Sequence, residues 1–254
     1  MKKRGQLTLM IILAIILIAV IIIIILISQR ASERPLDIQS QALSVTEQYK
    51  SAINFEIESC LKSISATTIR EIGLRGGYII WPDNSLETNF GRIAYGYYEG
   101  KSTFPTIEEI QEEISKEVVY KLPLCTKFFD DPQIEEQEPT IKTTILDEEV
   151  KVEANYPIKV NLNSTVLEIN QNNVASIKAR LGLLHKIATE IIQTQVETQQ
   201  INYILPKNYD FFVQIQVLDD TTAVYVLQDE KSNIAGDPYL FMFANKYTEA
   251  EELF

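Results

Sequence analysis

The sequence predicts an α+β protein that follows an N-terminal transmembrane helix. Apolar residues recur at steps of about 3.6 over 36–73 and 107–122, and they alternate with polar residues over 150–162. An uncharged apolar stretch, Leu7–Ile27, precedes both patterns. We therefore expect a membrane helix, a long amphipathic helix with aromatic strands, and an antiparallel sheet with one crossing helix.

The apolar stretch is long enough to span a bilayer. Leu7–Ile27 has Thr8 as its single polar residue, and at about 1.5 Å per helical residue it extends roughly 31 Å. Lys2, Lys3 and Arg4 precede it, so the positive-inside rule places the N-terminus in the cytoplasm. No small-residue cleavage site follows the stretch, so we expect a retained single-pass anchor in the cell membrane and an extracytoplasmic C-terminal domain.

The residues before the anchor carry a second interpretation. Lys3-Arg4-Gly5-Gln6, directly before an apolar helix, resembles the N-terminus of archaeal prepilin-like proteins. This resemblance implies cleavage between Gly5 and Gln6 and a pilin-like subunit of a type IV filament. Pilin-type signals carry a glutamate at the fifth position after the cut, where this sequence has Met10. An uncleaved anchor and a filament subunit both stay open.

Composition shifts divide the chain into three parts. We expect an N-terminal membrane anchor over 1–30, a helical and aromatic-strand subdomain over 31–132, and a sheet subdomain with an acidic tail over 133–254. The boundary at 132 falls in an acidic, proline-bounded segment, 130–139.

The elements of the two subdomains follow from periodicity and turn residues. In the first we expect a helix from 36 that stops at Gly73, strands over 78–81 and 92–98, and a helix from a Thr106 capping box to Pro123. In the second we expect strands over 141–146, 150–162, 165–169, 211–218, 223–227 and 239–243, with Pro157 at an edge or bulge and a crossing helix from Asn173 to about 199.

The only two cysteines are Cys60 and Cys125. In an oxidising extracellular setting such a pair most simply forms one disulfide, and two buried free thiols are the alternative. With a single histidine, His185, the chain lacks the usual four-ligand zinc set. We expect no metal site and no cofactor.

Catalytic motifs are absent from the sequence. It has no G-x-S-x-G, no phosphate-binding P-loop and no H-E-x-x-H, so no catalysis is expected and His185 is interpreted as a structural residue. An extracytoplasmic enzyme with an unrecognised site stays an alternative. Asn163-Ser164-Thr165 forms a sequon, which makes Asn163 a candidate glycosylation site.

The charge and the aromatic content of the chain limit the kinds of partner that we expect. The chain has 23 basic and 35 acidic residues, a formal net charge of −12, which argues against nucleic acid as a partner. The region 78–104 is rich in Tyr, Trp and Phe. It either makes a small core or forms a surface for a protein or glycan partner. The oligomeric state stays open.

Several segments together resemble uncharacterised single-pass extracytoplasmic proteins of small-genome archaea. They are Lys3-Arg4-Gly5-Gln6, Gly73-Leu74-Arg75-Gly76-Gly77-Tyr78, Tyr97-Tyr98-Glu99-Gly100, Pro105, Ile107-Glu108-Glu109, Leu122-Pro123-Leu124-Cys125 and Arg180-Leu181-Gly182. The resemblance implies a surface protein and carries no catalytic residue. We expect a membrane-anchored structural or binding protein of the cell surface.

Overall fold

The computed structural model describes residues 18, 21–23, 46–88, 91–128, 131, 133–162, 165–198 and 210–248. The chain divides into two compact units, Met1–Ala52 and Ile53–Phe254. The second unit combines helices with mostly antiparallel sheets, which confirms the α+β class. Among the described residues, no helix is long and apolar enough to cross a membrane. Of the expected anchor Leu7–Ile27, only residues 18 and 21–23 are described, and they are helical.

A long amphipathic helix is confirmed over residues 46–74, although the expected start at 36 lies outside the described residues. In the second unit its inner face is fully buried at Ile57, Leu61 and Ile72. These positions lie on one stripe because they are separated by whole helical turns.

The expected helix stop at Gly73 is wrong, because the helix continues to residue 74. A Cβ atom at Gly73 would lie 2.2 Å from the carbonyl oxygen of Leu240, so close packing on a strand explains this glycine. The chain turns at Gly76 and Gly77, which have φ values of 70° and 98°.

A six-stranded sheet contains the aromatic segment and the C-terminal strands. Its members are β1 (Ser85–Thr88), β2 (Gly91–Tyr98), β3 (Lys101–Ser102), β10 (Phe212–Val217), β11 (Thr222–Ile234) and β12 (Asp237–Lys246). The order is β1-β2-β12-β11-β10 with β3 beside β2, and only the β2–β12 pairing is parallel. The strands expected over 211–218, 223–227 and 239–243 are confirmed as β10, β11 and β12.

The strand expected over 78–81 is wrong, and β1 pairs with β2 in its place. Residues 78–81 are held by other bonds: the Tyr78 hydroxyl donates to the Thr103 carbonyl over 2.6 Å, and the Trp81 indole donates to the Arg92 carbonyl over 3.0 Å. Arg75 lies over the Trp81 ring at 4.3 Å.

Two three-stranded antiparallel sheets complete the second unit. One has the order β4-β7-β8 and the other β5-β6-β9. Their members are β4 (Ile134–Glu136), β5 (Thr140–Ile145), β6 (Val150–Asn155), β7 (Ile158–Leu162), β8 (Thr165–Ile169) and β9 (Asn172–Ile177). The strand expected over 150–162 is broken at Pro157, so that β6 and β7 lie at the centres of different sheets.

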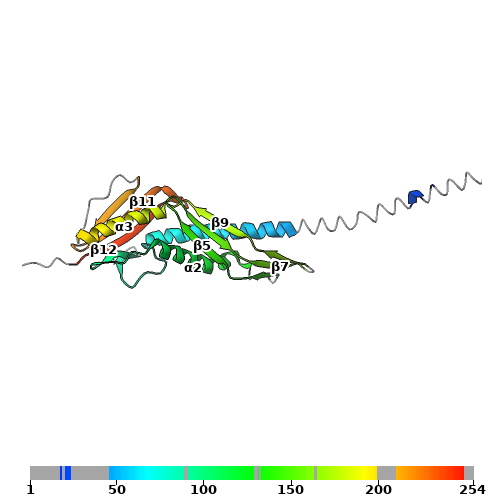
Figure 1. Ribbon diagram of the computed structural model, residues 1–254, viewed down its shortest axis with the longest axis horizontal. Helices are drawn as coiled ribbons and strands as arrows, with labels where there is room; N and C mark the ends of the chain where they lie inside the picture. The colour runs from blue at the N-terminus through cyan, green and yellow to red at the C-terminus, as the bar shows by residue number, and fades with distance from the viewer. Residues whose placement is uncertain are drawn as a thin grey trace, which may run out of the picture. The chain divides into compact units, whose positions relative to one another are not determined.

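Helix α2 (Ile107–Thr126) packs against β5 of one three-stranded sheet. Helix α3 (Leu181–Thr198) lies along β12 of the six-stranded sheet (Figure 1). The Thr106 capping box of α2 is confirmed. The stop at Pro123 is wrong: the helix runs to Thr126, and Lys127 in left-handed conformation donates its N–H to the Pro123 carbonyl over 3.1 Å. Cys125 therefore lies within the last turn.

The helix start expected at Asn173 is also wrong, because 172–177 form strand β9 and α3 begins at Leu181. In β9 the side chains of Asn173, Ala175 and Ile177 are buried, and the alternate ones are exposed. That period of two follows from pairing with β6.

A large core runs through the second unit, beside a smaller cluster of Ile93, Tyr95, Val224 and Ala244. It joins residues of the long helix, α2, α3 and the sheets, so both subdomains expected on either side of residue 132 contribute to it. The Cys60–Cys125 disulfide is confirmed, with Cα atoms 5.8 Å apart, and it ties the long helix to the end of α2.

Candidate functional site

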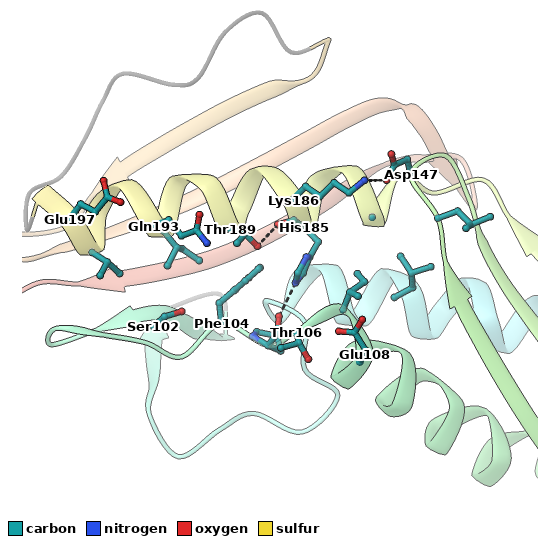
Figure 2. A pocket seen from close by; sticks show the side chains of 17 residues that line it. Ser102, Phe104, Thr106, Glu108, Asp147, His185, Lys186, Thr189, Gln193 and Glu197 are labelled. Atoms are coloured by element: carbon teal, nitrogen blue, oxygen red, sulfur yellow. Dashed lines mark hydrogen bonds and ion pairs between the residues drawn. The ribbon is translucent and has the colours of Figure 1, made fainter.

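A groove of about 1220 Å³ lies along one side of α3. Its other walls are the segment from β3 to the start of α2 and the turn after β5 (Figure 2). The lining is mainly apolar and includes Phe104, Ile145, Leu146, Ile192 and Val196. Such a concave, largely apolar surface with a few polar groups is typical of a ligand-binding site.

His185 forms the middle of the groove with Phe104. The two rings stack with centroids 4.9 Å apart and planes inclined by 24°. Nε2 of His185 lies 2.8 Å from the carbonyl oxygen of Pro105, which requires the proton on Nε2. Nδ1 is then the ring's hydrogen-bond acceptor. Burial lowers the pKa of His185, against the opposing influence of the Pro105 carbonyl and Glu108, so the ring is neutral at pH 7.

The opposite wall is fixed by the capping box of α2. The Thr106 backbone N–H donates to the Glu109 carboxylate over 2.8 Å, and the Glu109 N–H donates to the Thr106 hydroxyl over 3.2 Å. The Thr106 hydroxyl and the Glu109 carboxylate therefore form their hydrogen bonds within the cap. The cap holds the Pro105 carbonyl in place for His185.

Charged side chains lie at separate points along the groove rather than together. Lys186 forms an ion pair with Asp147, whose carboxylate is 2.5 Å from Nζ, and Glu197 lies at the other end of α3 (Figure 2). Lys186 and Glu197 are eleven positions apart on the helix, which corresponds to roughly 16 Å along its axis. With Glu108 also in the lining, acidic groups outnumber basic ones around this groove.

The two threonine hydroxyls among the described lining residues are engaged in local hydrogen bonds. The Thr189 hydroxyl donates to the His185 carbonyl over 2.8 Å, and the Thr106 hydroxyl is part of the cap. Among the described residues, no group of three or more His, Cys, Asp or Glu side chains could hold a metal ion. The arrangement can therefore hold an elongated, mainly apolar ligand, with His185 as a neutral polar contact.

A separate charged cluster supports the start of α3. Arg180 donates to Asp229 through Nε over 2.8 Å and through Nη2, and to Asp210 over 2.9 Å. Ser232 accepts the Arg180 backbone N–H over 2.8 Å, and Lys231 pairs with Asp210. Every charge in the cluster is paired, so its role is to hold α3 on β11.

Of the site residues expected from the sequence, the structure describes Cys60 and Cys125, and neither lines the groove. Cys60 and Cys125 form the disulfide, and Gly5, Gln6 and Asn163 lie outside the described residues. In the aromatic region 78–104, Tyr95 and Tyr97 are buried in the sheet, and Phe104 is the described aromatic residue there that lines the groove.

The groove itself was not expected from the sequence. His185, Thr189, Ile192 and Val196 recur at three- to four-residue steps and lie on one side of α3. This stripe is the sequence signal that could have indicated one wall of the groove. Nothing in the sequence showed that residues 102–108 and 145–147 would face it.

Comparison with known proteins adds no relative: no protein-family model, no curated protein and no solved structure matches this chain.

Proposed function

We propose that this chain is a membrane-anchored, extracytoplasmic binding protein of the cell surface. The observation that carries the proposal is the Cys60–Cys125 disulfide, which uses both cysteines of the sequence. Structural disulfides persist in oxidising compartments and are rare in the cytosol. The disulfide therefore supports a location of the folded unit outside the cytoplasm.

The N-terminal sequence supports the anchor. Leu7–Ile27 has the length and composition of a membrane span, and the cations Lys2, Lys3 and Arg4 favour a cytoplasmic N-terminus. This orientation and the disulfide agree, because both favour an exterior position for Cys60 and Cys125. The net charge of −12 suits a soluble surface domain that does not adhere to anionic lipid headgroups.

Binding, rather than catalysis, fits the groove along α3. Its centre is the stacked pair of Phe104 and His185, and its carboxylates lie apart from one another (Figure 2). A general acid and base would need two titratable groups that both reach the same reacting atom. The ligand class that fits is elongated, mainly apolar, and neutral or cationic.

Thiol trapping in the producing cells tests the proposal. Cells are quenched in acid, and the denatured protein is treated with a bulky maleimide reagent, with or without prior reduction. We expect no gel shift without reduction and a shift for two thiols after it. A shift for two thiols without reduction would show a reduced pair and contradict an exterior location.

A pilin-like filament subunit is the second candidate function. Lys3-Arg4-Gly5-Gln6 before the apolar stretch favours it, as does the long amphipathic helix over 46–74. Mass spectrometry of the mature N-terminus distinguishes the two candidates. A chain that begins at Gln6 supports the filament subunit, and one that begins at Met1 or Lys2 removes it.

A further inference from the structure

Strand β10 forms one edge of the six-stranded sheet. Among the described residues it pairs with β11 alone, from Phe212 opposite Gln228 to Val217 opposite Ala223. The strand Phe212–Val217 carries no charge, although the chain as a whole has a net charge of −12. Natural edge strands usually carry charges, prolines or bulges that prevent pairing with another chain. This edge has none of them.

The β11 pairing determines which backbone groups of β10 face outward. The Leu218 N–H donates to the Thr222 carbonyl over 2.9 Å, so residue 218 directs its hydrogen-bonding groups to β11. In an antiparallel ladder this direction alternates from residue to residue. Residues 212, 214 and 216 therefore face β11. The N–H and C=O groups of Val213, Ile215 and Val217 face the free edge.

The side chains of this edge form a palindrome about Ile215. The sequence Phe212-Val213-Gln214-Ile215-Gln216-Val217-Leu218 has the same side-chain type at equal distances before and after Ile215. Antiparallel pairing of two copies about a two-fold axis at Ile215 places apolar residues opposite apolar residues and amides opposite amides. Valine then meets valine, glutamine meets glutamine, and Phe212 meets Leu218.

We propose that β10 is the interface for a second copy of this chain, which extends the sheet by antiparallel pairing centred on Ile215. The three outward-facing residues then form three hydrogen-bonded pairs: Val213 with Val217, Ile215 with Ile215, and Val217 with Val213. In this register the side chains of two opposite residues lie on the same face of the extended sheet. Residues 212, 214, 216 and 218 share one face, and they pair only with one another.

The exposure of the apolar side chains agrees with this partner. Phe212 is 59 % exposed, Leu218 44 % and Val217 42 %. The pairing covers Phe212 with Leu218 on one face and Val217 with Val213 on the other. Beyond the strand, Asp220 of one copy approaches Asp210 of the other, whose carboxylate already pairs with Lys231 and Arg180. Like-charge repulsion at the ends is thereby reduced.

Other edges fit a second copy less well. The edge strands β1, β4, β5 and β8 each contain at least one charged residue. Strand β9 is uncharged, but its exposed side chains are Asn172, Val174 and Ser176, a single apolar residue between two polar ones. Strand β10 alone among the described edges combines lack of charge with palindromic side chains.

Charge substitutions at the two exposed glutamines test both the interface and its register. In the proposed dimer Gln214 lies opposite Gln216 of the other copy. A chain with Gln214→Lys and Gln216→Lys brings like charges together twice, whereas Gln214→Lys with Gln216→Glu brings opposite charges together twice. Sedimentation velocity of the full chain in density-matched detergent, over a concentration series, gives the dimer dissociation constant.

We expect a concentration-dependent dimer whose dissociation constant rises at least tenfold in the double-lysine chain. The lysine–glutamate chain dimerises at least as tightly as the parent, although it carries the same number of substitutions. Asn172→Lys with Val174→Lys, at the same spacing on the β9 edge, leaves the constant unchanged. A parent chain that is monomeric throughout, or a dimer equally weakened by both β10 variants or equally unaffected by them, would overturn the proposal.

Discussion

Arg180 and Asp229 form a buried ion pair in which one guanidinium donates two hydrogen bonds to one carboxylate. Nε of Arg180 lies 2.8 Å from Oδ2 of Asp229, and Nη2 bonds Oδ1. Arg180 is 5 % exposed and Asp229 is fully buried. The pair connects the residue just before α3 to β11, so it positions the helix that forms the groove.

Asp229→Asn leaves the Arg180 charge buried with only the Asp210 carboxylate to compensate it. Loss of one partner of a buried pair typically costs about 3–5 kcal/mol, and we expect a decrease of that order in the free energy of unfolding. Urea unfolding followed by circular dichroism measures it. Asp210→Asn is the matched control: Asp210 is half-exposed, so we expect little change. Equal effects of the two substitutions would contradict the account.

The same pair makes stability depend on acid pH. Burial alone would raise the pKa of Asp229, but hydrogen bonds from Arg180 and Ser232 outweigh burial and lower it. A carboxylate with a lowered pKa in the folded state stabilises the protein above its unfolded pKa, and this contribution is lost as the pH falls through the folded pKa. The stability difference between the parent and the Asp229→Asn chain should therefore be constant above about pH 5 and shrink below about pH 4. A difference that grows on acidification would refute this assignment.

His185 should titrate below the ordinary histidine range. Burial in the groove lowers its pKa, and the Pro105 carbonyl only partly opposes this effect. Since the chain has one histidine, its NMR resonance against pH is unambiguous. We expect a midpoint below about 6.5 in the folded chain and an ordinary value in urea. A folded midpoint at or above the value in urea would mean that the ring is not enclosed as described.

Gly182 determines how closely α3 approaches the turn after β5. A Cβ atom there would lie 2.5 Å from the carbonyl oxygen of Leu146, a backbone atom that can move only with its whole turn. We expect Gly182→Ala to lower the free energy of unfolding by about 1–3 kcal/mol through this clash, despite the better helix propensity of alanine. Thermal unfolding measures the change. A stabilised variant would show that the turn is free to move.

Local patterns were sufficient for much of the fold. The long helix has an apolar stripe that survives as its buried face, and the Thr106–Glu109 capping box forms with both of its hydrogen bonds. The Cys60–Cys125 pairing followed from the cysteine count and the inferred compartment.

Pairing with strands distant in sequence determines the structure of segments for which the local pattern predicts another element. Val174, Ile177 and Leu181 have helical spacing, yet β6 offers hydrogen bonds to 172–177, and these residues become β9. Pro123 lacks a backbone N–H to donate, yet α2 continues past it to Thr126 and ends where the Lys127 N–H donates to the Pro123 carbonyl. The groove needs three segments distant in sequence, so no single periodicity could predict it.

Epitope accessibility on intact cells tests the central claim most directly. A tag after Phe254 should bind antibody on intact cells as strongly as on permeabilised ones, because the unit with the Cys60–Cys125 disulfide is proposed to lie outside. A tag before Met1 serves as the control and should be detected only after permeabilisation. Detection of the C-terminal tag only after permeabilisation would contradict an extracytoplasmic binding protein.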